Sequence, residues 1–133
     1  MEHFTFTEFE RSDTATRHAI DNTLPDRAKR SIAALVDNVL DPLRKAWGKP
    51  LTVTSGYRCP RLNKAVGGKP TSQHLRGEAA DITTGSPTDN RRLFQLALDL
   101  KLPFDQLIDE SGFSWLHVSH RADGRNRRQV LKL

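Results

Sequence analysis

The stretch Ser72-Gln-His-Leu-Arg-Gly-Glu-Ala-Ala-Asp81 joins a histidine to a carboxylate through a glycine and a run of small residues. Residues 79–83, which begin within this stretch and continue past it, are typical of a buried strand, because small and β-branched residues are bounded by polar turns. Alternate side chains of a strand share a face, so Asp81 projects to one side. Gly77 lets the backbone turn, which brings His74 on the preceding loop beside Asp81. The stretch therefore predicts an imidazole and a carboxylate that face the same cavity.

A second stretch, Trp115-Leu-His-Val-Ser119, has the alternation of a half-buried strand with His117 at its centre. If both strands belong to one sheet, His117 and Asp81 can face a common cavity while the alternate residues enter the core. Two imidazole nitrogens and one carboxylate oxygen suit a catalytic zinc ion, whose fourth position is left for water with a pKa lowered to about 7. We therefore expect one zinc ion per chain, bound by His74, Asp81 and His117.

The residues before this stretch predict a mostly helical half. Thr5 and Glu8 form a capping-box pattern that begins a short helix, and residues 11–25 are polar and predict a connection. Residues 26–47 have apolar positions at spacings of three and four, as in an amphipathic helix, which Pro42 should bend or divide. Residues 51–57 alternate and predict a strand, and residues 61–66 predict a helical turn.

The residues after it predict one helix and several strands. A helix begins at Ser86 and ends by Pro103, residues 104–108 predict a third strand, and residues 115–119 would pair with it through a turn at Ser111 and Gly112. Residues 129–133 predict an edge strand. The order of elements predicts an α+β fold, with N-terminal helices packed on a small, mainly antiparallel sheet.

Length and composition are those of one globular domain over residues 1–133, with 36% hydrophobic and 28% charged residues. No apolar run approaches the roughly 20 residues of a membrane span, and the first residues lack a signal-peptide pattern, so we expect synthesis in the cytoplasm and no membrane insertion. Cys59 is the only cysteine. A metal site must therefore use histidine and carboxylate ligands.

Much of the net charge of +5 comes from a basic C-terminal tail that begins at about Arg121. Such a tail favours a polyanionic surface by Coulomb attraction, and a solvated, frayed terminus is the alternative. No aromatic residue that could stack on a base occurs in residues 121–133, so we expect no nucleic-acid partner. Nothing in the sequence indicates more than a monomer.

The pattern Ser72-x-His74-x-x-Gly77-x-Ala79-x-Asp81, followed by Trp115-x-His117-Val-Ser, resembles the zinc-site signature of the D-Ala-D-Ala carboxypeptidase family (M15) of peptidoglycan peptidases, which also includes phage endolysins. Ser55-Gly-Tyr-Arg58 resembles the substrate-arginine segment of that family. The resemblance extends from about Phe4 to Ser119. It implies the fold of Hedgehog and D,D-peptidase domains, with N-terminal helices on a small sheet that carries the zinc site.

The resemblance also implies the function. It makes His74, Asp81 and His117 the zinc ligands, and it makes Arg58 the residue that holds a substrate carboxylate or stabilises an oxyanion, for which a planar fork of donors is suited. Ser72 and Gln73 are candidates to hydrogen-bond the ligands or the substrate. The expected activity is zinc-dependent hydrolysis of peptidoglycan stem peptides by a D,D-carboxypeptidase or an endopeptidase. The enzyme would meet the cell wall after release or as part of a phage particle.

One position departs from the family pattern. Many members carry the acid or base carboxylate three residues before the last zinc histidine, and this chain has Ser114 there. Glu110 is the replacement candidate and Asp109 the second choice, and strand alternation allows only one of them to face the cavity. If neither reaches the metal, the chain would be a catalytically inactive, zinc-containing module that binds peptidoglycan.

Overall fold

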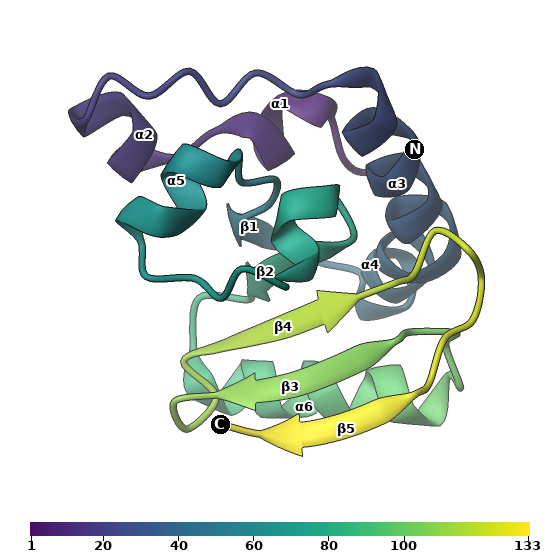
Figure 1. Ribbon diagram of the computed structural model, residues 1–133. Helices are drawn as coiled ribbons and strands as arrows, with labels where there is room; N and C mark the ends of the chain where they lie inside the picture. Colours follow the sequence, from purple (N-terminus) through teal and green to yellow (C-terminus); the bar gives the residue numbers. More distant parts are fainter.

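The computed structural model describes residues 1–133 and is built on one five-stranded sheet with the strand order β1-β2-β4-β3-β5 (Figure 1). The strands are β1 (Thr52–Ser55), β2 (Ala79–Thr83), β3 (Gln106–Glu110), β4 (Trp115–Ser119) and β5 (Gln129–Lys132). β2 pairs antiparallel with β1 and β4, β3 pairs antiparallel with β4, and only β5 lies parallel to its neighbour, β3. The predicted α+β fold with a mainly antiparallel sheet is confirmed.

Five helical segments precede the sheet: α1 (Phe6–Glu10), α2 (Asp13–Arg17), α3 (Asp26–Leu35), the π-helical turn η1 (Val36–Leu40) and α4 (Asp41–Trp47). The capping box is confirmed, since the Thr5 backbone N–H donates to Glu8 Oε2 over 2.7 Å. The prediction of a plain connection over residues 11–25 is wrong, because α2 lies within it. Ser12 caps α2 by accepting from the Ala15 N–H. A helix of this length is too short to show the repeating pattern of apolar residues by which longer helices are predicted.

The long amphipathic segment is divided just before Pro42, as predicted. Pro42 lies in the first turn of α4, where its missing N–H costs no helical hydrogen bond. The turn before it widens to π-helix, which separates α3 from α4. Gly48 ends α4 with a left-handed φ of 77°. Pro42 thus marks the start of α4, directly after the π-helical turn.

Three further helices complete the fold: α5 (Pro60–Ala65), the 3₁₀ turn η2 (Gln73–Arg76) and α6 (Pro87–Asp99). α6 begins at Ser86, whose Oγ accepts from the Asp89 N–H, and packs on β3 and β4, behind the sheet in Figure 1. α1, α2 and α5 gather beyond the β1 edge. No helix combines the length and the apolar character needed to cross a membrane.

The two faces of the central strands have opposite character. Ile82, Leu107 and Leu116 are fully buried and join the helices in one hydrophobic core. Burial of each such side chain stabilises the fold by about 1.5–3 kcal/mol relative to exposure. Because side chains alternate along a strand, the same packing turns Asp81 and His117 to the opposite face.

Two predicted strand boundaries were wrong. β1 ends at Ser55 because Gly56 and Tyr57 leave the sheet to meet α1, where the Tyr57 N–H donates to the Phe9 carbonyl. β3 begins at Gln106 because Phe104 lies in a turn with its side chain in the core. Both shifts matter for the site, since they place Gly56 next to the metal ligands and put residue 110 inside a strand.

The predicted edge strand is confirmed as β5, and the chain end is not a solvated tail. Asp105 accepts from the backbone N–H and the guanidinium of Arg127, at 2.9–3.0 Å. The Arg128 guanidinium lies 5.3 Å from the centre of the Phe104 ring. Residues 121–133 are therefore part of the folded domain.

Candidate metal centre

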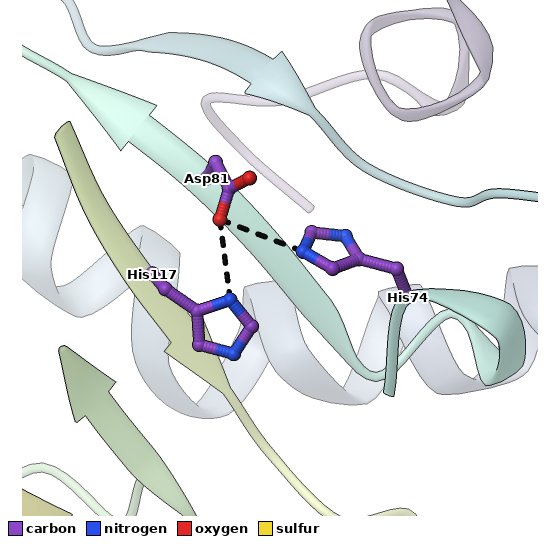
Figure 2. Close-up of side chains that lie close together, drawn as sticks. All are labelled: His74, Asp81 and His117. Atoms are coloured by element: carbon purple, nitrogen blue, oxygen red, sulfur yellow. Dashed lines mark hydrogen bonds and ion pairs between the residues drawn. The ribbon is translucent and has the colours of Figure 1, made fainter. Parts of the chain in front are cut away.

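The three predicted ligands converge on one point above the sheet (Figure 2). Asp81 and His117 are direct cross-strand partners of β2 and β4, with Oδ1 3.2 Å from Nδ1. His74 Nε2 lies 3.5 Å from the same Oδ1, and the three ligand atoms are all within 4.8 Å of one another. Tetrahedral zinc with bonds of about 2.0–2.1 Å spaces its ligands about 3.3–3.5 Å apart. The donor set and its spacing therefore fit zinc.

The orientation of His74 is fixed by hydrogen bonds on its far side. Its Nδ1 lies 2.7 Å from the Gly56 carbonyl, which can only accept, so Nδ1 carries the proton. The Nε2 lone pair is then directed at Asp81. Ser72 Oγ accepts from the His74 N–H and caps η2, which holds the ring in place.

Gly77 lets η2 and β2 meet at the site. Its φ is +72°, and a Cβ there would lie 2.7 Å from the carbonyl oxygen of Ala28 on α3. A left-handed φ and this close approach leave room for glycine alone. His74 and Asp81 are thus brought together by a backbone turn packed tightly on α3.

The electrostatics of Asp81 favour a carboxylate ligand. Burial acts to raise its pKa, but the imidazoles of His117 and His74, which donate to the carboxylate and carry positive charge when protonated, outweigh burial and hold the pKa of this carboxyl well below its usual range. The carboxylate form of Asp81 is therefore favoured. A deprotonated oxygen is the form that binds a metal.

Arg58 lies beside the ligands, on the loop that follows β1. Its Nη2 is 3.8 Å from Asp81 Oδ2, while Nε donates to Ser55 Oγ and Nη1 to Asn63 Oδ1, both at 3.3 Å. Burial lowers the pKa of Arg58, and the Asp81 charge opposes that change. The guanidinium is held by its neighbours with Nη2 on the side of Asp81. No sequence pattern indicated that Asn63 would hold this guanidinium.

The ligands open into a cleft of roughly 730 Å³ that crosses this face of the sheet. Every residue predicted for the site lines it, namely Arg58, Ser72, Gln73, His74, Asp81, Glu110 and His117. The cleft also has residues that sequence reasoning missed, chiefly Ile108 and the C-terminal Arg121, Arg127, Leu131 and Leu133. Alternation of side chains along the predicted edge strand puts Leu131 and Leu133 on one face. This would have indicated that both line the cleft if the partner strand had been known.

Of the two carboxylates considered for proton transfer, Glu110 faces the cleft. It pairs with Trp115 on β4 and is two residues from Ile108, the partner of His117. Burial raises the pKa of Glu110, and the Asp81 charge adds to that effect. Asp109 points to the other face, where its Oδ1 accepts from the Phe113 N–H at 2.6 Å.

Ser114 and His120 stay outside the cleft. Ser114 is exposed and its Oγ donates to the Ser111 carbonyl, which fits a turn residue. His120 is buried, and its backbone N–H donates to the Glu78 carbonyl. Neither side chain is among those that line the cleft.

Comparison with known proteins agrees with this geometry. A family model described as Peptidase M15 matches residues 2–119. Over 48 residues the chain is 46% identical to a zinc D-Ala-D-Ala carboxypeptidase of Streptomyces albus G. That match covers 35% of this chain and 19% of the relative, so the chain matches about a fifth of the length of this curated protein.

Proposed function

Since the chain belongs to the peptidase M15 family, we propose that it is a zinc-dependent peptidase that hydrolyses peptide bonds in the stem peptides of bacterial peptidoglycan. The observation that carries the proposal is the convergence of His117 and His74 on one oxygen of Asp81, at 3.2 and 3.5 Å, in an open cleft. The partial match to a protein named zinc D-Ala-D-Ala carboxypeptidase supports the choice of substrate.

His74, Asp81 and His117 would hold one zinc ion and leave its remaining position directed into the cleft. Zinc bound there supplies a Lewis acid that polarises the scissile carbonyl and lowers the pKa of water. Because the His74 tautomer and the Asp81 charge are already set by the protein, the ligands need little rearrangement to receive the ion.

Glu110 and Arg58 supply the remaining groups of the reaction. Glu110 takes a proton from the attacking water and gives it to the leaving amine, a role for which its place on the cleft face is suited. Arg58 binds the oxygen that becomes negative at the scissile carbonyl, or the terminal carboxylate of a carboxypeptidase substrate. Ser72 and Gln73 line the cleft beside His74 and bind the peptide backbone.

The proposed substrate lies outside the cell membrane. We therefore also propose that the protein acts on the wall as a monomer, after release from the cytoplasm or as part of a phage particle, in the manner of an endolysin. A second candidate function is a zinc-containing module that binds peptidoglycan without cleaving it. The observation that favours this candidate is Ser114, which is exposed and bonded to its own turn at the position where the family resemblance implies a carboxylate.

The test is the metal content of the purified protein, together with hydrolysis of purified peptidoglycan and of defined stem peptides, before and after chelation. We expect about one zinc per chain and cleavage that is lost with the chelator and restored by zinc. The new termini separate the activities, because a carboxypeptidase releases single D-amino acids and an endopeptidase releases peptides. Zinc binding without cleavage would favour the binding module, and the absence of zinc binding would refute both functions.

A further inference from the structure

The C-terminal residues form a wall of the cleft, although they lie beyond the part of the chain that matches the family. The match ends at residue 119, while Arg121, Arg127, Leu131 and Leu133 all line the cleft. In Figure 1 this segment descends from β4 and returns as β5 along the far edge of the sheet. The cleft of this protein is therefore shaped by residues that the family pattern does not include.

Two buried carboxylates attach this wall to the sheet. Glu78 Oε2 accepts from the Ala122 N–H at 2.7 Å, and Asp105 accepts from the backbone and side chain of Arg127. Glu78 is 6% exposed and Asp105 is fully buried. Hydrogen bonds to buried charged groups are costly to break, so the path of the chain between these two anchors is well defined.

After Arg127, which Asp105 holds, the C-terminal segment extends the floor of the cleft away from the candidate metal ligands. β5 pairs Leu131 with Ile108, and Ile108 pairs with His117 across β3 and β4. The Ser111 N–H donates to the Leu133 carbonyl and fixes the end of the strand. A peptide bound at the metal thus has an apolar floor on this side, with Arg121 and Arg127 at its rim.

Two other arginines that line the cleft have a carboxylate partner within hydrogen-bonding distance. Arg127 Nη2 is 2.9 Å from Asp105 Oδ2, and Arg76 Nε is 2.8 Å from Glu78 Oε1. The Arg121 guanidinium differs, because its nearest carboxylate oxygen, on Asp123, is 3.7 Å away and outside hydrogen-bonding distance.

The backbone of Arg121 is nevertheless fixed. Its N–H donates to Asn126 Oδ1 at 2.7 Å, and its carbonyl accepts from the Gly124 N–H at 2.9 Å. The side chain makes only one long contact, to the Arg125 carbonyl at 3.5 Å. A guanidinium that lines the cleft from a hydrogen-bonded turn, with most of its donors unused, is suited to bind a planar anion.

We propose that Arg121 is a specificity-determining residue that binds a carboxylate carried on a side chain of the peptide substrate, away from the scissile bond. The inference rests on the proposed peptidase function. Arg121 follows His117 by four residues, or about 13 Å of extended chain at roughly 3.3 Å per residue. The carboxylate would therefore lie within about four substrate residues of the cleaved bond.

The experiment uses two synthetic stem peptides that differ at one side chain, which ends in a carboxylate in one and in a carboxamide in the other. Binding by calorimetry and kcat/KM are measured for the zinc-loaded wild type, Arg121→Gln and Arg125→Gln. The Arg125→Gln variant is the matched control, because it removes the same charge from the same exposed turn without altering the cleft lining. We expect the wild type and the control to prefer the carboxylate peptide about five- to tenfold, and Arg121→Gln to lose that preference.

Several results would overturn the proposal. Equal affinity of the wild type for both peptides would do so, as would an equal loss of preference in Arg125→Gln, which would indicate a general charge effect. A uniform loss for both peptides in Arg121→Gln would indicate a structural role. If the peptides bind but are not cleaved, the proposed peptidase function is wrong. The ratio of the affinities for the carboxylate and carboxamide peptides still tests the role of Arg121. Binding of neither peptide contradicts both.

Discussion

Asp81 and His117, which are 36 positions apart in the sequence, are direct partners across β2 and β4, with Oδ1 3.2 Å from Nδ1. The sheet therefore fixes two of the three ligands independently of the third. His74 completes the set from a separate turn, which is held by the Gly56 carbonyl. The site therefore depends on the register of the sheet and on the turn around Gly77.

Replacement of Asp81 tests the shared ligand. Asp81→Asn keeps the shape of the side chain but removes the charge between two imidazoles, so zinc affinity should fall by more than about a hundredfold. Competition with a chelator of known affinity measures this. Asp99→Asn, on the exposed end of α6, is the control and should bind zinc normally. Equal affinity of Asp81→Asn and wild type would remove Asp81 from the ligand set.

Gly77 and Gly124 form a matched pair, with φ of +72° and +77°. Only Gly77 has a neighbour where Cβ would be, the Ala28 carbonyl. Gly124→Ala should cost about 1–2 kcal/mol of unfolding free energy from the left-handed φ alone, and Gly77→Ala should cost about 1–3 kcal/mol more. Denaturant unfolding measures both. Zinc affinity should fall in Gly77→Ala only, and similar effects in the two variants would contradict the close packing on α3.

Glu110→Gln should lower kcat on stem peptides about a hundredfold or more while zinc content is unchanged, because proton transfer is lost and the ligands are intact. Asp109→Asn is the companion variant. It weakens the hydrogen bond to the Phe113 N–H and should lower stability by about 1 kcal/mol, with activity retained below the unfolding temperature. The reverse pattern would transfer the catalytic role to Asp109.

Arg58→Lys keeps the positive charge and removes the planar fork that bonds Ser55 and Asn63. We expect kcat/KM to fall at least about tenfold, because an ammonium group cannot be held by both neighbours and also present donors to the substrate. Arg61→Lys, in the exposed part of α5, should have no effect. Steady-state kinetics decide between these outcomes, and full activity of Arg58→Lys would mean that charge alone matters.

The attachment of the C-terminal wall should depend on pH. Burial acts to raise the pKa of Asp105, but hydrogen bonds and charge from Arg127 outweigh it and lower the pKa. A carboxyl whose pKa is lower in the folded state stabilises the fold above its unfolded pKa, about 3.9, and this contribution is lost as the pH falls below that value. Asp105→Asn should therefore lower the unfolding free energy by about 2 kcal/mol at pH 7, and by progressively less below pH 4.

Unfolding of the wild type and Asp105→Asn by denaturant at pH 7, 5 and 3.5 measures this difference. A constant difference across the series would mean that the Asp105 charge does not contribute. Arg128→Gln serves as a reference. It also removes a guanidinium from the segment, but its contacts are with Phe104 and the Leu102 carbonyl, so its effect should not vary over this range.

The sequence by itself predicted the fold class and the three candidate metal ligands that the structure brings together. His74, Gly77 and Asp81 lie in one decapeptide, and alternation around His117 is enough to assign its face, because side-chain direction in a strand follows from sequence position. Helix caps such as Thr5 and Ser86 and the helix breaker Pro42 act on neighbouring residues, so the sequence also predicted the helix boundaries that they set. The division of the long helix and the α+β arrangement followed from them.

Only the tertiary structure decided which groups share the cleft with those ligands. The choice of Glu110 over Asp109 depended on where β3 begins and on its register with β4, which core packing of Phe104 and Leu107 sets. The docking of residues 121–133 depended on Glu78 and Asp105, two carboxylates whose partners are 44 and 22 positions away, respectively. Such contacts leave no periodic trace in the sequence, because their energy comes from burial and pairing that exist only once the sheet has formed.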